Sequence, residues 1–279
     1  MSKDSYFLQH PNGAELTRLL EQASLMKEYV PLFPPSIDKS DIYTILDIGC
    51  GPGTWALDVA FHRPDARVIG LDSSSGMVRY AEAWACSQEL ENVSFQRADA
   101  RDRLPFFDAA FDLVHMQLAT SWVKNEIWLS LLQEVRRILQ PGKFIVFTDS
   151  QLPATNSPAL KRLNQLLLHL LRHMHLGMCK EEDNDLGVLY SLGPLLHQAA
   201  FLAIKVEVVD INFSFSEAAT HKRCFDDLMA LFTQLRQQIL DEELTTWEDY
   251  QQLLAQFTQE SWREDFVGIS KLYTFTAHT

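Results

Sequence analysis

Short segments rich in β-branched and aromatic residues recur between residues 43 and 149, and helix-like stretches separate most of them. These segments read YTILDI, ARVIGLD, VSFQRAD, FDLVHM and FIVFTD. Strands that alternate with helices are typical of βαβ units, in which a parallel sheet is covered by helices on both faces. The alternation predicts a doubly wound α/β core over residues 41–150.

The segments on either side of this core are mainly helical. Residues 1–40 hold one probable helix closed by prolines, and we expect an N-terminal helical lid segment there. Residues 151–279 contain further helical stretches and two late strand-like segments, AIKVEVVDINFSF and KLYTFTAHT. We therefore predict a seven-stranded, mostly parallel sheet whose last strand is antiparallel, with helical insertions that complete a pocket.

A glycine-rich turn, GCGPG, follows the first predicted strand and precedes a helix-like stretch. Glycine tolerates a positive φ and lets a ligand approach the backbone, while a helix N-terminus offers N–H groups to an anion. A P-loop would need a lysine and a hydroxyl residue after the turn, where the chain reads GTWA. A dinucleotide turn would need a third glycine where Thr54 stands. The spacing G-x-G-x-G therefore disfavours a nucleoside triphosphate and a dinucleotide as ligands of this turn.

Four motifs in this order resemble those of the class I S-adenosylmethionine-dependent methyltransferases. They are LDIGCGPGTW, the acidic strand end in VIGLDSSSGMVRYAE, ADARDRLPFFDAAFDLVHMQ, and LLQEVRRILQPGKFIVFTD. The resemblance covers about residues 42–150 and implies a Rossmann-like fold with S-adenosyl-L-methionine as the cofactor. Lys143 stands where the family usually has a second glycine, in a turn that does not serve the cofactor.

The resemblance also implies a set of cofactor-binding residues. Asp72 falls where the ribose-binding acid of the family lies, Asp99 could accept from the adenine amine, and Met77 offers an apolar surface to the ring. Asp72 could instead cap the helix that begins near Ser75, and Asp99 could stabilise a turn. The complete predicted set is Asp47, Gly49, Cys50, Gly51, Gly53, Asp72, Ser73, Met77, Asp99, Ala100, His115, Met116, Gln117 and Tyr6.

His115, near the end of the fourth predicted strand, is the candidate catalytic base, because histidine titrates near neutrality. It could instead be part of the cofactor wall or an ordinary core residue. After it the chain reads QLATSW and lacks the N/D-P-P-Y/F signature with which methyltransferases of amino groups bind their acceptor. The missing signature disfavours a planar amine acceptor.

Other features of the sequence narrow the ligands and partners. A formal net charge of −13 disfavours nucleic acid, which proteins bind largely through lysine and arginine. We expect no membrane span, and four scattered cysteines suit a reducing compartment such as the cytoplasm. His169 and His173 lie one helical turn apart among leucines, so we expect a lid helix and no metal site. The pair Asp226 and Asp227 reads as a solvated helix face.

The sequence thus predicts a cytoplasmic methyltransferase that moves a methyl group to a small-molecule acceptor by in-line displacement. Two alternatives keep the fold but change the function. In one, the bound sulfonium supports a cyclisation or isomerisation without transfer. In the other, the protein senses the cofactor and is not an enzyme. The acceptor, the methylated atom and the oligomeric state do not follow from the sequence.

Overall fold

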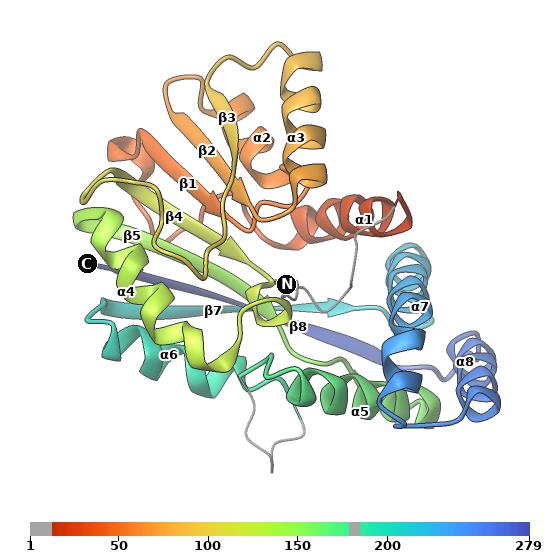
Figure 1. Ribbon diagram of the computed structural model, residues 1–279. Coiled ribbons are helices and arrows are strands. Elements are labelled where there is room, and N and C mark those ends of the chain that lie inside the picture. Colours follow the sequence, from red (N-terminus) through yellow and green to blue (C-terminus); the bar gives the residue numbers. More distant parts are fainter. Residues whose placement is uncertain (1–12, 179–184) are drawn as a thin grey trace.

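A computed structural model of the chain describes residues 13–178 and 185–279. In this part of the chain, helices separate the strands as far as β5, except that β4 follows β3 directly, and helices dominate afterwards (Figure 1). The helices are α1 (Gly13–Tyr29), α2 (Thr54–His62), α3 (Ser75–Ser87), α4 (Trp128–Ile138), α5 (Pro158–His173), α6 (Val188–Gln198), α7 (Ala218–Asp241) and α8 (Trp247–Ser261). The strands are β1 (Thr44–Ile48), β2 (Arg67–Asp72), β3 (Val93–Arg97), β4 (Phe111–Gln117), β5 (Leu139–Ser150), β6 (Ala154–Thr155), β7 (Leu202–Asn212) and β8 (Gly268–His278).

All of these strands belong to one sheet. Its order runs β3-β2-β1-β4-β5-β8, and both β6 and β7 pair with β8. The first five strands are mutually parallel, whereas β8 runs antiparallel to β5 and to β7. The predicted doubly wound, mostly parallel sheet with an antiparallel last strand is confirmed. The described strands number eight where seven were predicted, because Ala154 and Thr155 pair with the start of β8.

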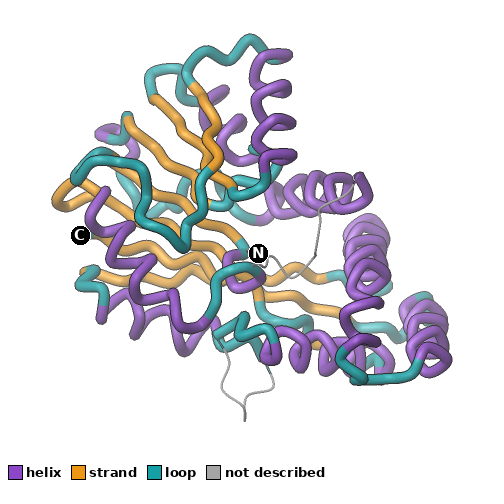
Figure 2. Tube along the Cα trace, in the orientation of Figure 1, coloured by secondary structure: helices purple, strands orange, loops and turns teal. Residues whose placement is uncertain are grey.

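The helices lie on both faces of the sheet and beyond one of its ends. Helices α2 and α3 pack on one face over Ile45, Leu113 and Val146, while α4 packs on the other face over Val114 and Phe147 (Figure 2). Helices α1, α5, α7 and α8 gather where the parallel strands end (Figure 1). This arrangement leaves the carboxyl ends of the strands facing a group of helices.

Local sequence explains where several helices begin and end. The Ser157 hydroxyl accepts the Leu160 N–H and Pro158 occupies the first turn, so α5 begins there. The helical stretch between residues 218 and 261 divides into α7 and α8, and the hydroxyl of Thr246 caps α8 by accepting the Asp249 N–H.

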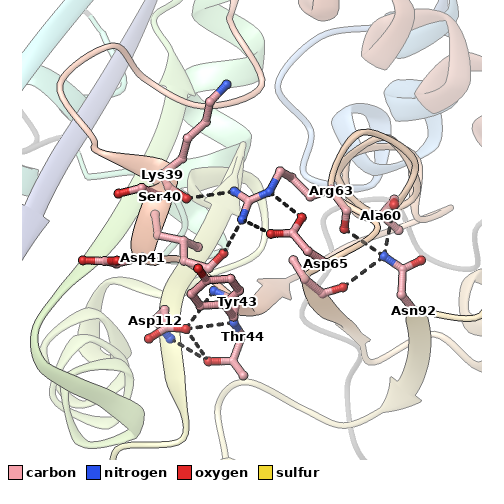
Figure 3. A network of polar contacts seen from close by, with 12 residues as sticks. Lys39, Ser40, Asp41, Tyr43, Thr44, Ala60, Arg63, Asp65, Asn92 and Asp112 are labelled. Atoms are coloured by element: carbon pink, nitrogen blue, oxygen red, sulfur yellow. Dashed lines mark hydrogen bonds and ion pairs between the residues drawn. The ribbon is translucent and has the colours of Figure 1, made fainter.

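At the amino ends of the parallel strands, a polar network fixes the starts of β1 and β4 (Figure 3). One carboxylate oxygen of Asp112 accepts the N–H groups of Tyr43 and Thr44 and the Thr44 hydroxyl, each at 2.9 Å. The guanidinium of Arg63, at the end of α2, donates to the carbonyl of Ile42 at 2.9 Å. The network sets the register of β1 and β4, and hence the positions of their far ends.

Two glycines of the turn after β1 should differ in the stability that the protein loses when they are replaced by alanine. Gly53 caps α2 with a φ of +81°, and a Cβ there would lie 2.8 Å from both the Cβ of Ala81 and the ring of Phe95. Gly51 has a φ of +53°, but a Cβ there would meet nothing within 4 Å. We expect Gly51→Ala to cost about 1–2 kcal/mol of unfolding free energy, from the left-handed backbone alone.

Gly53→Ala should cost about 1–3 kcal/mol more than Gly51→Ala, because its methyl group must also displace packed side chains. Urea unfolding of both variants measures the difference. Equal losses would show that the neighbours of Gly53 move aside without cost.

Candidate functional site

A cavity of about 910 Å³ opens beyond the carboxyl ends of the parallel strands, and we call it the main cavity. Its strand half is formed by the turn after β1, the end of β2, the start of α3 and the residues that follow β3. Its helix half is formed by α1, α5 and α7 together with the ends of β5 and β7. Elements from both ends of the chain therefore enclose one space.

The glycine turn is held in place by the end of β2. The N–H groups of Gly49 and Cys50 donate to the carbonyl of Leu71 at 2.7 and 3.0 Å. The N–H of Gly51 donates to Oδ2 of Asp72 at 2.9 Å. Because β1 and β2 are parallel neighbours, their ends lie side by side and the Asp72 side chain can reach the turn.

Gly51 provides space for a ligand at this turn. It lines the main cavity, and a Cβ at this position would project where no heavy atom lies within 4 Å. No side chain in the described part of the chain caps the next helix, α2, at its N-terminus, where Thr54 also lines the cavity. Backbone N–H groups at such an end attract an anionic group such as a carboxylate.

Asp72 contacts backbone groups and does not cap α3. Its Oδ1 accepts the N–H of Ser74 at 2.8 Å, whereas the cap of α3 is the Ser74 hydroxyl, which accepts the N–H of Met77. Burial raises the pKa of Asp72, and the hydrogen bonds from Ser74 and Gly51 oppose that rise. A carboxylate can accept about four hydrogen bonds, so Asp72 retains acceptor capacity toward the cavity.

Asp99 also borders the main cavity, but its carboxylate is already engaged. It accepts Nε of Arg101 at 2.8 Å and the Arg101 backbone N–H at 2.9 Å, and the guanidinium lowers its pKa. Its neighbour Ala100 lines the same wall. The turn-stabilising interpretation of Asp99 therefore has structural support, and a contact with an adenine amine would have to share the carboxylate with Arg101.

The predicted residues fall into two groups. Those that line the main cavity are Gly49, Cys50, Gly51, Asp72, Ser73, Met77, Asp99, Ala100 and Gln117. Those that do not line it are Asp47, Gly53, His115 and Met116. Met116 is fully buried in the core that α4 covers, and Gly53 lies behind the turn against Phe95. Tyr6 lies outside the described residues.

His115 lies away from the main cavity, next to α2. Its Nδ1 is 2.8 Å from Oδ1 of Asp47, and its ring stacks on Trp55 with the centroids 3.7 Å apart. It lines a separate cavity of about 630 Å³ between α1 and α2. His115 shares the face of β4 that Leu113 presents to α2, so we do not propose it as the catalytic base.

Two carboxylates that sequence reasoning did not select line the main cavity. Asp149, at the end of β5, accepts the N–H and the hydroxyl of Thr120 at 2.9 and 2.8 Å. Its place at the end of a predicted strand was a signal available in the sequence. Asp227 lies on α7, and the prediction of a solvated face there is wrong because α1 packs against that face. Only its neighbour Asp226 is exposed.

Trp122 is a further cavity residue missed by the sequence. Its indole packs so closely on Gly49 that a Cβ at Gly49 would lie 2.6 Å from Cζ2 of the ring. The indole thus joins the turn after β4 to the turn after β1. His169 and His173, in contrast, are exposed on α5, and Nε2 of His173 lies 3.0 Å from Oε2 of Glu242, the residue that follows α7.

Comparison with known proteins finds similarity over the segment that forms the strand half of the cavity. Residues 45–142 match a family model described as a methyltransferase domain. The chain is 32% identical over 111 residues to a demethylmenaquinone methyltransferase of Lactococcus lactis, which covers 39% of this chain and 43% of the relative. It is 36% identical over 102 residues to a trans-aconitate 2-methyltransferase of Azoarcus, covering 37% of each. The chain thus spans less than half the length of either relative.

Solved structures share the fold beyond that region. A phosphoethanolamine N-methyltransferase of Haemonchus contortus superposes with a TM-score of 0.52 at 16% identity, covering 94% of this chain and 52% of the other. The YcgJ protein of Bacillus subtilis gives a TM-score of 0.51 at 18% identity, over 85% of this chain and 93% of the other. At such identities the similarity concerns the fold.

The buried carboxylate of Asp149 generates a prediction on stability. Burial raises its pKa to about 6, against an ordinary value of about 3.9. Between these values the folded protein holds a proton that the unfolded chain has lost, so rising pH lowers the unfolding free energy. From about pH 4 to about pH 7, we expect Asp149 to account for a loss of about 2 kcal/mol.

Urea unfolding at both pH values measures this contribution by comparing wild type with Asp149→Asn. The variant should lose about 2 kcal/mol less than wild type over the same interval. The exposed Asp226→Asn variant controls for removal of a surface carboxylate. Parallel pH profiles of wild type and Asp149→Asn would contradict the raised pKa.

Proposed function

We propose that this protein is an S-adenosylmethionine-dependent methyltransferase that methylates a small molecule inside the main cavity. The match of residues 45–142 to a methyltransferase-domain model supports the proposal. The observation that carries the proposal is the hydrogen bond that the Gly51 N–H donates to the Asp72 carboxylate. It places an open backbone turn and an acidic side chain on the same wall of a cavity large enough for two ligands.

The strand half of the cavity fits the cofactor group by group. The remaining acceptor capacity of Asp72 suits ribose hydroxyls, and the apolar side chain of Met77, which lines the cavity, suits an adenine ring. The uncapped N-terminus of α2 suits the carboxylate of the amino-acid part. The open position at Gly51 is the space that any larger residue would take from the ligand.

When bound, S-adenosyl-L-methionine supplies an activated methyl group on a positively charged sulfur. The walls of the cavity suit such a charge, since the carboxylates that line it outnumber the guanidinium groups. The carboxylates are Asp72, Asp99, Asp149 and Asp227, and the guanidinium groups are those of Arg18, Arg97 and Arg101. Displacement in line needs the acceptor atom to be held at short range and in the right direction, without a covalent bond to the protein. The main tasks of these residues are therefore to orient two ligands and to exclude water.

The helix half of the cavity fits a small apolar acceptor. Leucines from two helices, Leu167 and Leu171 on α5 and Leu228 and Leu231 on α7, line it. No helix in the described ranges is long and apolar enough to cross a membrane. We expect the reaction to take place in the cytoplasm, on a metabolite and not on nucleic acid, in keeping with the net charge of −13.

Replacing Asp72 with Asn tests the proposed cofactor contact while keeping the volume of the side chain. A hydrogen bond to a charged group contributes about 1.5–3 kcal/mol, so the variant should bind S-adenosylhomocysteine about 10- to 100-fold more weakly. Isothermal titration calorimetry measures the change, with Asp226→Asn as the control. An unchanged affinity of the Asp72→Asn variant for S-adenosylhomocysteine would show that Asp72 does not contact the cofactor.

The activity itself is tested with methyl-labelled S-adenosylmethionine and a fractionated metabolite extract. Label should move to one or a few small molecules when wild type is present. If wild type binds neither S-adenosylmethionine nor S-adenosylhomocysteine, the proposed function is wrong.

A further inference from the structure

We infer that Asp227 recognises the methyl acceptor, and that this acceptor is an apolar molecule with a hydrogen-bond-donating head, a hydroxyl or an ammonium, and not an anion. The inference rests on the proposed function, because it assigns the helix half of the main cavity to the acceptor. It concerns a residue outside the matched region, which ends at residue 142.

The position of Asp227 is fixed by a polar contact between α1 and α7, which lie next to each other (Figure 1). Nη1 of Arg18 donates to Oδ1 of Asp227 at 3.0 Å. Nε and Nη2 of the same guanidinium donate to the two oxygens of Glu15, at 2.7 and 2.8 Å, and the Glu15 side chain is only 1% exposed. The buried Glu15 therefore orients Arg18, which presents one edge to Asp227.

The second oxygen of Asp227 is weakly engaged. Its contact to Nε2 of Gln22 is 3.5 Å long, at the outer limit of a hydrogen bond. The Asp227 side chain is 19% exposed, and the residue lines the main cavity. Since a carboxylate can accept about four hydrogen bonds, Asp227 has acceptor capacity left for a donor inside the cavity.

The other carboxylates of the cavity are less suited to this task. Asp99 is chelated by Arg101, and Asp149 accepts three hydrogen bonds of 2.8 to 2.9 Å from Thr120 and Ser150. Asp72 lies in the strand half, beside the glycine turn. Asp227 is therefore the carboxylate that faces the helix half with the fewest close donors.

The surroundings of Asp227 determine which heads fit. On α7 its cavity-lining neighbours are Leu228, Leu231 and Cys224, and burial raises the pKa of the Cys224 thiol to about 12, so this thiol is uncharged at neutral pH. Glu15, Arg18 and Asp227 together carry one net negative charge, and Glu15 occupies two of the Arg18 donors. A carboxylate on the acceptor would therefore be repelled, whereas a hydroxyl or an ammonium would be attracted. The leucines accommodate the apolar body.

The experiment uses three probes that share a naphthalene body and differ only in the head. The probes are 2-naphthalenemethanol, 2-naphthalenemethylamine and 2-naphthoate, titrated calorimetrically into the protein saturated with S-adenosylhomocysteine. We expect the alcohol and the amine to bind wild type at least tenfold more tightly than the carboxylate. Asp227→Asn should reduce this preference at least fivefold, while Asp226→Asn, which alters the exposed neighbour on α7, should leave it unchanged.

A second variant covers the case in which Asp227→Asn does not fold. Asp227→Glu keeps the charge but shifts the carboxylate, so it should weaken the alcohol and the amine and still exclude the carboxylate. Equal affinity of wild type for all three probes, no binding of the alcohol and the amine, or identical profiles of Asp227 and Asp226 variants would overturn the inference. If S-adenosylhomocysteine still binds normally, such results leave the proposed function intact. If S-adenosylhomocysteine does not bind to wild type, the proposed function itself is refuted.

Discussion

The hydrogen bond from the Gly51 N–H to Asp72 connects the two chain segments on which the site depends. A turn of three glycines would be flexible on its own, because glycine restricts its backbone least. The carboxylate at the end of β2 holds the middle of that turn, and Leu71 holds its first residues. The same side chain also orders the start of α3 through Ser74. One partly buried acid thereby aligns the ends of β1 and β2 with the helices that follow them.

The strand half of the site could be predicted because its geometry is local. Parallel strands end at one edge of a sheet, so Gly51, Asp72 and Asp99, each placed at or shortly after the end of a strand-like segment, had to lie near one another. Motif spacing was enough to place them. The sequence could not predict on which face of the sheet a strand residue lies, because a strand buried on both faces shows no alternation of polar and apolar residues. His115 was misplaced for that reason.

The helix half could not be predicted because it depends on contacts between distant segments. Asp227 borders the cavity only because α1 packs beside α7, and no spacing within α7 indicates which of two adjacent acids turns inward. Trp122 is similar, since its role depends on reaching Gly49 across the gap between two strands. The two halves thus come from different parts of the chain. Residues 45–142, which match a methyltransferase-domain model, form the strand half, whereas α1 and the helices after β5 and β7 form most of the helix half.

The ion pair of Arg18 with Asp227 joins residues 209 positions apart in the chain. Contacts of such separation close late, because the chain entropy lost in bringing their partners together must first be offset by the packing of the sheet between them. The parallel strands β1 to β5 can therefore pair before the helix half is enclosed. During synthesis the cavity closes only when both α7 and β8 have left the ribosome, because β8 follows α7 in the chain, pairs with β5 and also lines the cavity. The ability to bind two ligands therefore develops late in the folding of this chain.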